Sequence, residues 1–280
     1  MSLRGQLQHN VKMATFSAWG VGGVAQAVYT PADEADAAAF LAGLRLDEPL
    51  LVHGSGAYIV VREGGYRGMV LSTCALDAMT LDGATLYAEV GIGCAALVQY
   101  ARNHGFTGLG WMLGVPGTLG GALVTNAGVR DERVWSRVEA VKTLDRHGRT
   151  HRRAPDAFGI GAVFAGASRH ADELMVGVWL RPKARAQDTT TSGALSGPRA
   201  VSQLFAADDV LHVLEVADQV PGRVRLDRAS GQLHLDAQPD AVGLEAAIRG
   251  LCDAASAVAG RPVNCRLRFV GEPLREVSGL

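Results

Sequence analysis

The densest glycine segment of the chain runs from Gly108 to Gly128 and reads GLGWMLGVPGTLGGALVTNAG. Within it, Pro116 stiffens the backbone, and Thr118 and Asn126 supply small hydrogen-bonding groups between glycines that carry no side chain. A glycine held in regular structure costs about 0.5–1 kcal/mol relative to alanine, so this run favours a backbone that a ligand approaches closely. The glycines concerned are Gly114, Gly117, Gly120, Gly121 and Gly128.

A shorter glycine loop, Gly54-Ser55-Gly56, is the first of the two along the chain and follows the short apolar stretch Leu50 to His53, which predicts a strand. Such a loop can turn backbone N–H groups toward an anion, although a tight turn requires glycine just as often. For each of three nearby side chains, two interpretations stay open. Tyr58 either stacks on an adenine or ribose or points to solvent, and His53 either meets a phosphate or lies on the surface. Trp111 either flanks a ligand ring or packs in the core.

Length and composition limit the class of protein. The 280 residues suffice for two domains, and 48% hydrophobic with 20% charged residues is typical of a globular chain. Lys and Arg number 27 against 28 Asp and Glu, so the basic surface that nucleic-acid binding requires is not expected. No apolar stretch reaches the length of a membrane span, and the first ten residues do not resemble a secretory signal. We therefore expect a cytoplasmic protein without a membrane span.

Metal binding is not expected from the cysteines and histidines. Cys74, Cys94, Cys252 and Cys265 lie far apart without a CxxC pair, and the eight histidines form neither HxH nor HxxxH. Thiolate metal sites usually contain a close pair. The sequence therefore predicts no metal site, and the cysteines are interpreted as small buried side chains in a reducing compartment.

Helices and strands alternate in the first half of the chain. Thr30-Pro31-Ala32-Asp33 predicts a helix start, with Thr30 as N-cap and alanines from Ala35 to Ala42 on one face. Leu86 to Val90 predicts a strand, and the helix after it places Cys94, Leu97, Val98 and Ala101 on one face before Gly105.

The second half mixes hairpins with helices, which indicates an α+β or mixed α/β fold. Strands are predicted at 138–144, 150–153 and 174–180, and a domain boundary in the polar stretch 182–198. A hairpin at 224–235, a helix at 241–259 and a strand at 263–270 follow. Arg266 and Arg268 alternate along that last strand, so we expect them to share one face, either solvated or holding a nucleotide diphosphate.

Four motifs in order resemble the UDP-N-acetylenolpyruvoylglucosamine reductases (MurB), flavoenzymes of peptidoglycan precursor synthesis. They are Trp19-Gly20-Val21-Gly22-Gly23, Gly54-Ser55-Gly56-Ala57-Tyr58, Gly114-Val115-Pro116-Gly117-Thr118-Leu119-Gly120-Gly121 and Asn126-Ala127-Gly128. The resemblance spans residues 15–180. It implies an α+β fold of the vanillyl-alcohol-oxidase type, with FAD between two subdomains of a 1–185 domain that divide near residue 73. A divergent C-terminal substrate domain of the same family would cover 186–280.

The resemblance also implies which residues bind FAD and how the reaction proceeds. The implied FAD-binding residues are Gly54, Ser55, Gly56, Ala57, Tyr58, Gly114, Val115, Pro116, Gly117, Thr118, Gly120, Gly121, Asn126, Ala127 and Gly128. NADPH would reduce the flavin, and a hydride would then pass to the enolpyruvyl double bond of a nucleotide sugar. The implied reaction needs a cation or a hydrogen-bond donor at the substrate carboxylate and a positioned proton source.

Three groups that the family uses for this chemistry are replaced here. The arginine of its FGYR motif falls on Gly161, the serine of its GSxFKNP motif on Ala194, and the glutamate of its late strand on Arg266. Ser192, Ser196 or Ser202 could supply the serine only if the alignment shifts. Three hypotheses therefore stay open: a reductase of this type with displaced catalytic groups, a non-catalytic relative with a binding or regulatory role, and a flavin oxidoreductase with another substrate.

Overall fold

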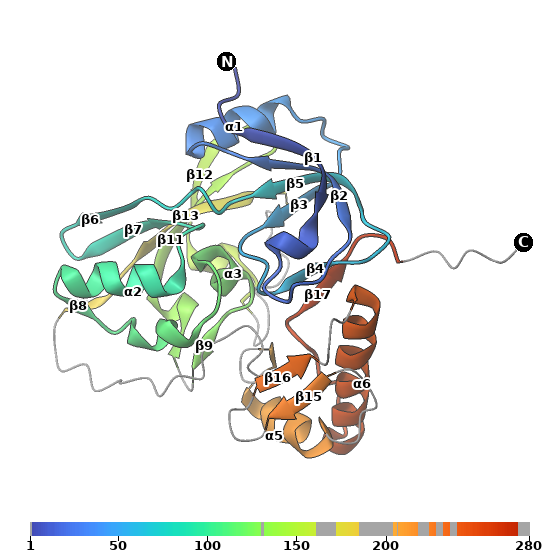
Figure 1. Cartoon of the computed structure of the whole chain (residues 1–280). Helices are drawn as coiled ribbons and strands as arrows, with labels where there is room; N and C mark the ends of the chain where they lie inside the picture. Colours follow the sequence, from blue (N-terminus) through green and yellow to red (C-terminus); the bar gives the residue numbers. More distant parts are fainter. Residues whose placement is uncertain are drawn as a thin grey trace, which may run out of the picture.

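The structure is a computed structural model that describes residues 2–129, 132–160, 172–184, 204–205, 207–217, 224–227, 232–235 and 240–273. Two separate sheets with their helices form the N-terminal part, and a smaller unit of helices and a hairpin lies at the other end of the molecule (Figure 1). The predicted α+β class is confirmed. Within the described residues, no helix combines the length and the apolar character that crossing a membrane requires.

The first sheet has the strand order β1-β2-β5-β3. Its antiparallel pair is β1 (Gln6–Lys12) with β2 (Val24–Thr30), and β5 (Tyr66–Ser72) runs parallel to both β2 and β3 (Leu50–His53). Helix α1 (Glu34–Gly43) begins later than predicted, because Thr30 still pairs with Gln6 in the sheet. The N-cap is instead Asp33, whose carboxylate accepts a hydrogen bond from the Asp36 N–H at 2.9 Å.

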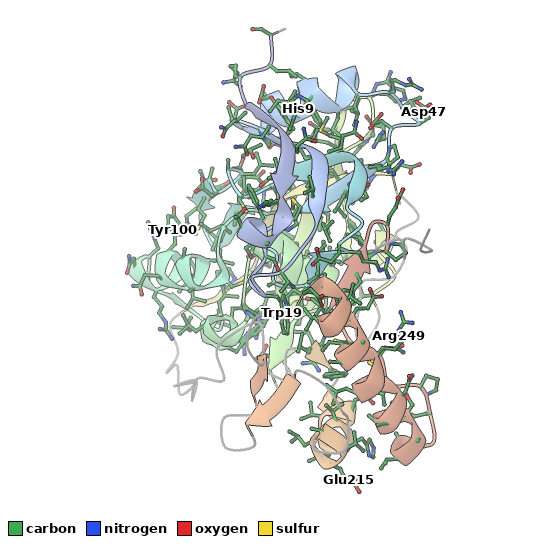
Figure 2. The ribbon with its side chains drawn as sticks, turned by 45° about the vertical axis from the view of Figure 1, so that its right-hand side comes forward. His9, Trp19, Asp47, Tyr100, Glu215 and Arg249 are labelled. Atoms are coloured by element: carbon green, nitrogen blue, oxygen red, sulfur yellow. The ribbon has the colours of Figure 1, made fainter. Side chains whose placement is uncertain are left out.

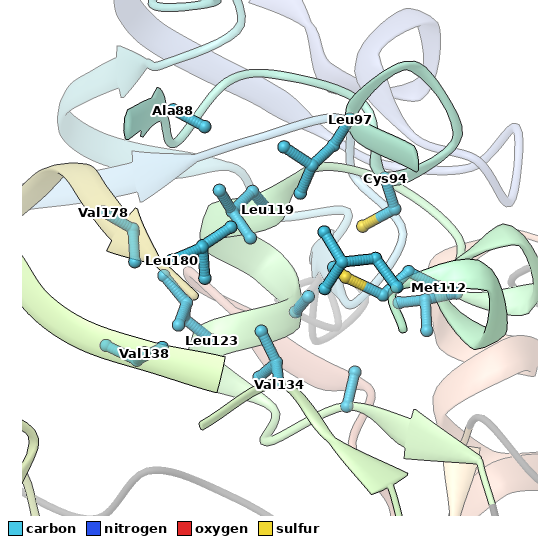
Figure 3. Close-up of a cluster of buried hydrophobic side chains, with 14 of the residues drawn as sticks. Ala88, Cys94, Leu97, Met112, Leu119, Leu123, Val134, Val138, Val178 and Leu180 are labelled. Carbon is cyan, nitrogen blue, oxygen red and sulfur yellow. The ribbon is translucent and has the colours of Figure 1, made fainter. Parts of the chain in front are cut away.

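The second sheet is antiparallel throughout, in the order β12-β11-β13-β7-β6. Its strands are β6 (Met79–Asp82), β7 (Thr85–Glu89), β11 (Val138–Leu144), β12 (Thr150–Arg153) and β13 (Leu174–Leu180). Helices α2 (Cys94–Asn103) and α3 (Leu119–Val124) pack against it. Figure 3 shows the resulting core, in which Leu119 and Leu123 of α3 lie among sheet residues such as Val178 and Leu180.

Several short elements connect these layers. Strand β8 (Phe106–Thr107) pairs with β14 (Lys183–Ala184), and β9 (Gly128–Val129) pairs with β10 (Glu132–Arg133). The 3-10 helices are Met13–Phe16, Gly110–Gly114, Val134–Arg137 and Pro155–Ala157.

The C-terminal unit packs its helices against the N-terminal part. Its elements are α5 (Ala207–Val216), β15 (Val224–Asp227), β16 (Gln232–Leu235), α6 (Ala241–Ala259) and β17 (Arg268–Val270). Trp19 and Val60 join Phe205, Leu244 and Ile248 in one buried cluster, and Figure 2 shows Trp19 beside the upper end of α6. Strand β17 then pairs in parallel with β4 (Ile59–Val61), which follows the first glycine loop.

Most predicted elements are confirmed, and two predictions besides the start of α1 need correction. The hairpins at 138–153 and 224–235, the helix at 241–259 and the buried face of α2 are as predicted. The last strand is shorter than predicted, because only Arg268–Val270 enters a ladder. All four cysteines are free thiols, but only Cys94 is buried as predicted, whereas Cys252 and Cys265 are half-buried and Cys74 is exposed. The polar stretch proposed as a domain boundary lies mostly outside the described residues.

Candidate functional site

A cavity of about 410 Å³ lies where the first glycine loop, α3, the start of β13 and residues 266–268 meet. Small-molecule sites are commonly concave spaces of this size, roughly 300–1,000 Å³. Apolar side chains such as Val90, Val124 and Leu174 cover much of its wall. The residues of the predicted FAD site that line the cavity are Gly54, Tyr58, Thr118, Gly120 and Gly121.

The two glycine loops contact each other, which the sequence did not reveal. A Cβ at Gly54 would lie 2.6 Å from the Thr118 Oγ1. A Cβ at Gly117 would lie 2.8 Å from the Ser55 Oγ, and Gly117 also has a φ of +87°. A methyl group at either place would force one of these hydroxyls to move, and the positive φ of Gly117 independently favours glycine there.

Backbone hydrogen bonds fix the second loop on the strand and helix that precede it. The N–H groups of Leu119 and Gly120 donate to the carbonyl oxygens of Ile92 and Val90 at 2.9 and 2.8 Å. The Cys94 N–H donates to the Gly117 carbonyl at 3.1 Å. The Thr118 hydroxyl caps α3 by accepting from the Gly121 N–H at 3.4 Å. This loop is therefore a rigid wall of the cavity.

Gly56, Ala57 and Thr118 are buried residues of the two glycine loops, and Thr118 also lines the cavity. Within the described residues, no backbone carbonyl accepts a hydrogen bond from the N–H groups of these three residues. Buried N–H groups are nearly always paired, because leaving one unmade costs about as much as a lost hydrogen bond. Successive N–H groups in a glycine loop form a common binding site for phosphate oxygens. The loops therefore fit the diphosphate of a dinucleotide such as FAD.

Other residues of the predicted FAD site lie away from the cavity wall. Val115 packs in the hydrophobic core of the second sheet. Asn126 follows α3 in a left-handed conformation with a φ of 45°, and a Cβ at Gly128 would meet the Glu132 carbonyl oxygen at 2.1 Å. Ser55, Gly56 and Ala57 and the rest of the 114–117 and 126–128 stretches are also absent from the lining. Direct contact of these residues with FAD stays a prediction.

The structure adds lining residues that the sequence analysis missed. Thr73 follows β5, and Thr125 follows α3, and both side chains are buried at the cavity. Thr73 could have been found from its position, because β3 and β5 are parallel neighbours that end at the same edge of their sheet. Met175 on β13 could not have been found from the sequence, because its strand joins the cavity only through long-range packing.

Arg266 does not lie on a solvated strand face, as one interpretation expected. Its side chain is buried with 3% exposure, whereas Arg268 is exposed and begins β17. The Arg266 N–H donates to the Leu204 carbonyl at 2.7 Å, and its Nη1 donates to the Phe205 carbonyl at 2.6 Å. Burial lowers the pKa of Arg266, and the nearby positive charge of Arg133 acts in the same direction. Arg266 and Arg268 both line the cavity.

The structure also decides between interpretations of three ring side chains. His53 is buried with 2% exposure and meets the Phe16 ring edge-on, so it is not a surface histidine. Burial lowers the pKa of its imidazole. Tyr58 points into the protein and lines the cavity, and burial raises the pKa of its hydroxyl. Trp111 belongs to the hydrophobic core.

Two of the three substituted family positions, Gly161 and Ala194, lie outside the described residues, as do Ser192, Ser196 and Ser202. Arg266 is the one that the structure describes. Among the described residues, no group of three or more His, Cys, Asp or Glu side chains is arranged to hold a metal ion.

Comparison with known proteins relates part of the chain to an FAD binding domain and to a group of reductases. The profile of the FAD binding domain family matches residues 25–153. The UDP-N-acetylenolpyruvoylglucosamine reductase of Alkalilimnicola ehrlichii is 46% identical over 158 residues, which are 56% of this chain and 53% of that reductase. The reductase of the same name from Nitrosomonas eutropha is 41% identical over 165 residues, covering 57% of this chain and 50% of its own length.

A solved structure extends the likeness in fold to nearly the whole chain. The UDP-N-acetylenolpyruvylglucosamine reductase (MurB) from Thermus caldophilus superposes with a TM-score of 0.73 and covers 96% of this chain and 99% of its own, at 20% identity. The chain spans about half the length of the curated relatives that it matches. Over a little more than half of its length, the chain is thus similar to UDP-N-acetylenolpyruvoylglucosamine reductases, and residues 25–153 match the FAD binding domain family.

Proposed function

We propose that the chain binds FAD in the cavity between the two glycine loops. The observation that carries this proposal is the meeting of the two glycine loops at the cavity, where Gly54, Gly120 and Gly121 line the wall and the Thr118 N–H would donate to the diphosphate. Gly121 leaves room there, because a Cβ at this position would meet only ordinary contacts at 3.7 and 3.9 Å. The match of residues 25–153 to an FAD binding domain supports the same assignment.

The wall residues have separate tasks in this proposal. Val90, Val124 and Leu174 exclude water from the bound ligand, which strengthens each electrostatic contact inside. The Tyr58 hydroxyl keeps its proton at neutral pH, because burial raises its pKa, so it can donate a hydrogen bond. FAD, when bound, supplies hydride transfer.

The activity we propose is the NADPH-dependent reduction of an enolpyruvyl nucleotide sugar. Its support is the name that the relatives share, UDP-N-acetylenolpyruvoylglucosamine reductase, together with the fold shared with the Thermus caldophilus structure. In this proposal residues 1–185 form the FAD-binding domain, and residues 186–280 form the unit that contacts the substrate. The remaining residues of the predicted FAD site would support the loops that line the cavity.

A second candidate function is FAD binding without this reaction. The observation that favours it is Arg266, a buried cation that lines the cavity at the position where the family resemblance implies an acid. Exchanging an acid for a guanidinium reverses the local charge and removes a group that could give up a proton, because arginine stays protonated in proteins.

One experiment separates these functions. The purified chain is loaded with FAD and its visible spectrum is recorded, since a flavin spectrum with shifted bands reports a bound cofactor. NADPH is then added without oxygen, followed by UDP-N-acetylglucosamine enolpyruvate. Bleaching by NADPH and recovery of the flavin bands on adding the enolpyruvyl nucleotide supports the reductase.

The other outcomes are equally clear. Bleaching without recovery favours a flavin oxidoreductase with another substrate. A bound flavin that NADPH does not reduce favours the non-catalytic role. A colourless chain that takes up no FAD contradicts the proposal as a whole.

A further inference from the structure

Two of the four cysteines meet in the C-terminal unit, where the segment after α6 returns along the helix. Cys252 lies on α6, and Cys265 directly precedes Arg266. Both are free thiols, and both are half-buried against the same hydrophobic cluster. Neither lines the cavity of the proposed FAD site, so FAD binding does not account for them.

The turn after α6 decides which residues face each other. Gly260 ends the helix in the left-handed conformation, with a φ of 66°, and the chain reverses. The Val263 N–H then donates to the Ser256 Oγ at 2.9 Å, and this hydroxyl donates to the Cys252 carbonyl at 2.6 Å. Cys252 lies one helical turn before Ser256, about 6 Å along the axis, and two extended residues beyond Val263 cover about the same length. This register brings Cys265 opposite Cys252.

The surroundings of the two sulfur atoms agree with this register. Burial raises the pKa of the Cys252 thiol, and the Cys265 N–H, which faces that sulfur, acts in the opposite direction. Burial also raises the pKa of Cys265 to about 12, and the Cys252 sulfur lies near enough to raise it further by repulsion between thiolates. The Cys265 sulfur itself accepts from the Leu267 N–H at 3.4 Å. The two thiols are therefore neighbours in an apolar environment.

We infer that Cys252 and Cys265 form a redox pair, which closes to a disulfide on oxidation and fastens one wall of the cavity to α6. The wall concerned is the segment of Arg266 and Arg268, both of which line the cavity. The bridge would close a loop of about 15 residues, which restricts how far that segment can move away from the helix. Disulfides that form in reducing compartments are usually transient and redox-sensing.

A small disulfide such as oxidised glutathione supplies the oxidising equivalents. The Cys252 thiolate attacks one of its sulfur atoms, and a first glutathione thiolate leaves. The Cys265 thiolate then attacks the Cys252 sulfur of the mixed disulfide, and a second glutathione leaves. Two thiols of the chain lose two electrons and two protons, and one glutathione disulfide becomes two glutathione thiols. Because burial disfavours both thiolates, the exchange is expected to be slow at neutral pH.

The test uses the whole chain with Cys74→Ser, because Cys74 is exposed and could form bridges between chains. The protein is incubated with oxidised glutathione at about pH 8.5, where more thiolate is present. We expect two of the three remaining thiols to be lost and unreduced peptide mapping to link residues 252 and 265. Cys252→Ser in the same background is the matched control and should give no linked peptide.

Hydrogen exchange then tests whether the bridge fastens the wall. Closing a loop of about 15 residues corresponds to roughly a hundredfold in an opening equilibrium. The backbone amides of residues 263–270 should therefore exchange at least about tenfold more slowly in the oxidised protein than after reduction with dithiothreitol. In Cys252→Ser the same treatment should change these exchange rates less than twofold.

Two results would overturn the inference. The redox pair is refuted if no peptide links residues 252 and 265, or if Cys94 is the partner found. The fastening of the wall is refuted if the bridge forms and the amides of 263–270 exchange equally fast in both states. Circular dichroism reports whether the variants fold, and Cys252→Ala replaces the serine control if that variant does not. FAD binding, measured separately, stands or fails independently of both results.

Discussion

Replacing Gly54 with alanine tests the contact between the two glycine loops. The new Cβ would lie 2.6 Å from the Thr118 Oγ1, which is too close, but 3.7 Å from the Thr118 Cβ and Cγ2, which is ordinary contact. The clash is thus confined to one oxygen atom. Either that hydroxyl rotates and stops capping α3, or the loops separate. Overpacking of this kind costs about 1–3 kcal/mol of unfolding free energy.

The oxygen can be removed to test the assignment. Thr118→Ala loses the cap on the Gly121 N–H and should cost about 1 kcal/mol by itself. In that background the nearest atom to the new Cβ is 3.7 Å away, so Gly54→Ala should cost little more. We expect a coupling energy of about 1–2 kcal/mol in the double-mutant cycle. Thr118→Ser keeps the oxygen and is the matched control, in which Gly54→Ala stays as costly as in wild type.

The assay is urea unfolding at 25 °C for the four variants of the cycle and the serine controls, with the FAD dissociation constant measured in parallel. Gly54→Ala should also weaken FAD binding, because separating the loops moves the Gly56 and Thr118 N–H donors apart. Additive costs, within about 0.5 kcal/mol, would refute the contact as the reason for glycine at position 54. The same conclusion follows if Gly54→Ala costs as little unfolding free energy in the Thr118→Ser background as in the Thr118→Ala background.

Three further predictions concern the cavity, a buried histidine and the C-terminal unit. Gly121→Ala should raise the unfolding free energy by about 0.5–1 kcal/mol through helix propensity and yet weaken FAD binding, because its methyl group enters the cavity; unchanged FAD fluorescence titrations would contradict this. Burial lowers the pKa of His53, so below about pH 6.5 the unfolded chain binds more protons than the folded chain and stability falls. The melting temperature should therefore fall less between pH 7 and pH 5 in His53→Gln than in wild type. An equal fall in both proteins would show that this histidine is not responsible. Arg62 donates twice to the Glu245 carboxylate at 2.8 Å, so Arg62→Ala should cost about 1–2 kcal/mol in urea unfolding, more than alanine at the exposed Arg249.

The sequence could predict those elements whose signals are local. Asp145 to Gly148 between residues 138–144 and 150–153 indicated the β11–β12 hairpin, and the spacing of Cys94, Leu97 and Ala101 indicated the buried face of α2. The start of α1 was misplaced because Thr30 and Pro31 carry a helix-start signal, while the pairing of Thr30 with Gln6 is a tertiary contact that overrides it. The parallel neighbours of β5 and of β4 are also tertiary, so local patterns could not give them.

The same distinction applies to the candidate site. Glycine loops at Gly54 and Gly120 could be found, because missing side chains are visible in a sequence. Their mutual contact at Gly54 and Thr118 could not, since it joins segments far apart in the chain. Arg266 was placed on a strand face because it alternates with Arg268, but alternation has meaning only where the backbone is in a ladder, and the ladder starts at Arg268.

The pairing of β17 with β4 has a consequence for biosynthesis. In the described part of the chain, β4 has no other strand neighbour, and the segment that carries Arg266 is held at Tyr58 by the same strand connection. A ribosome makes residues 59–61 well before residues 268–270, because the two strands lie far apart in the sequence. The wall that these two segments share can be assembled only after residues 268–270 have been made, so a ligand that needs this wall would bind after that point in synthesis.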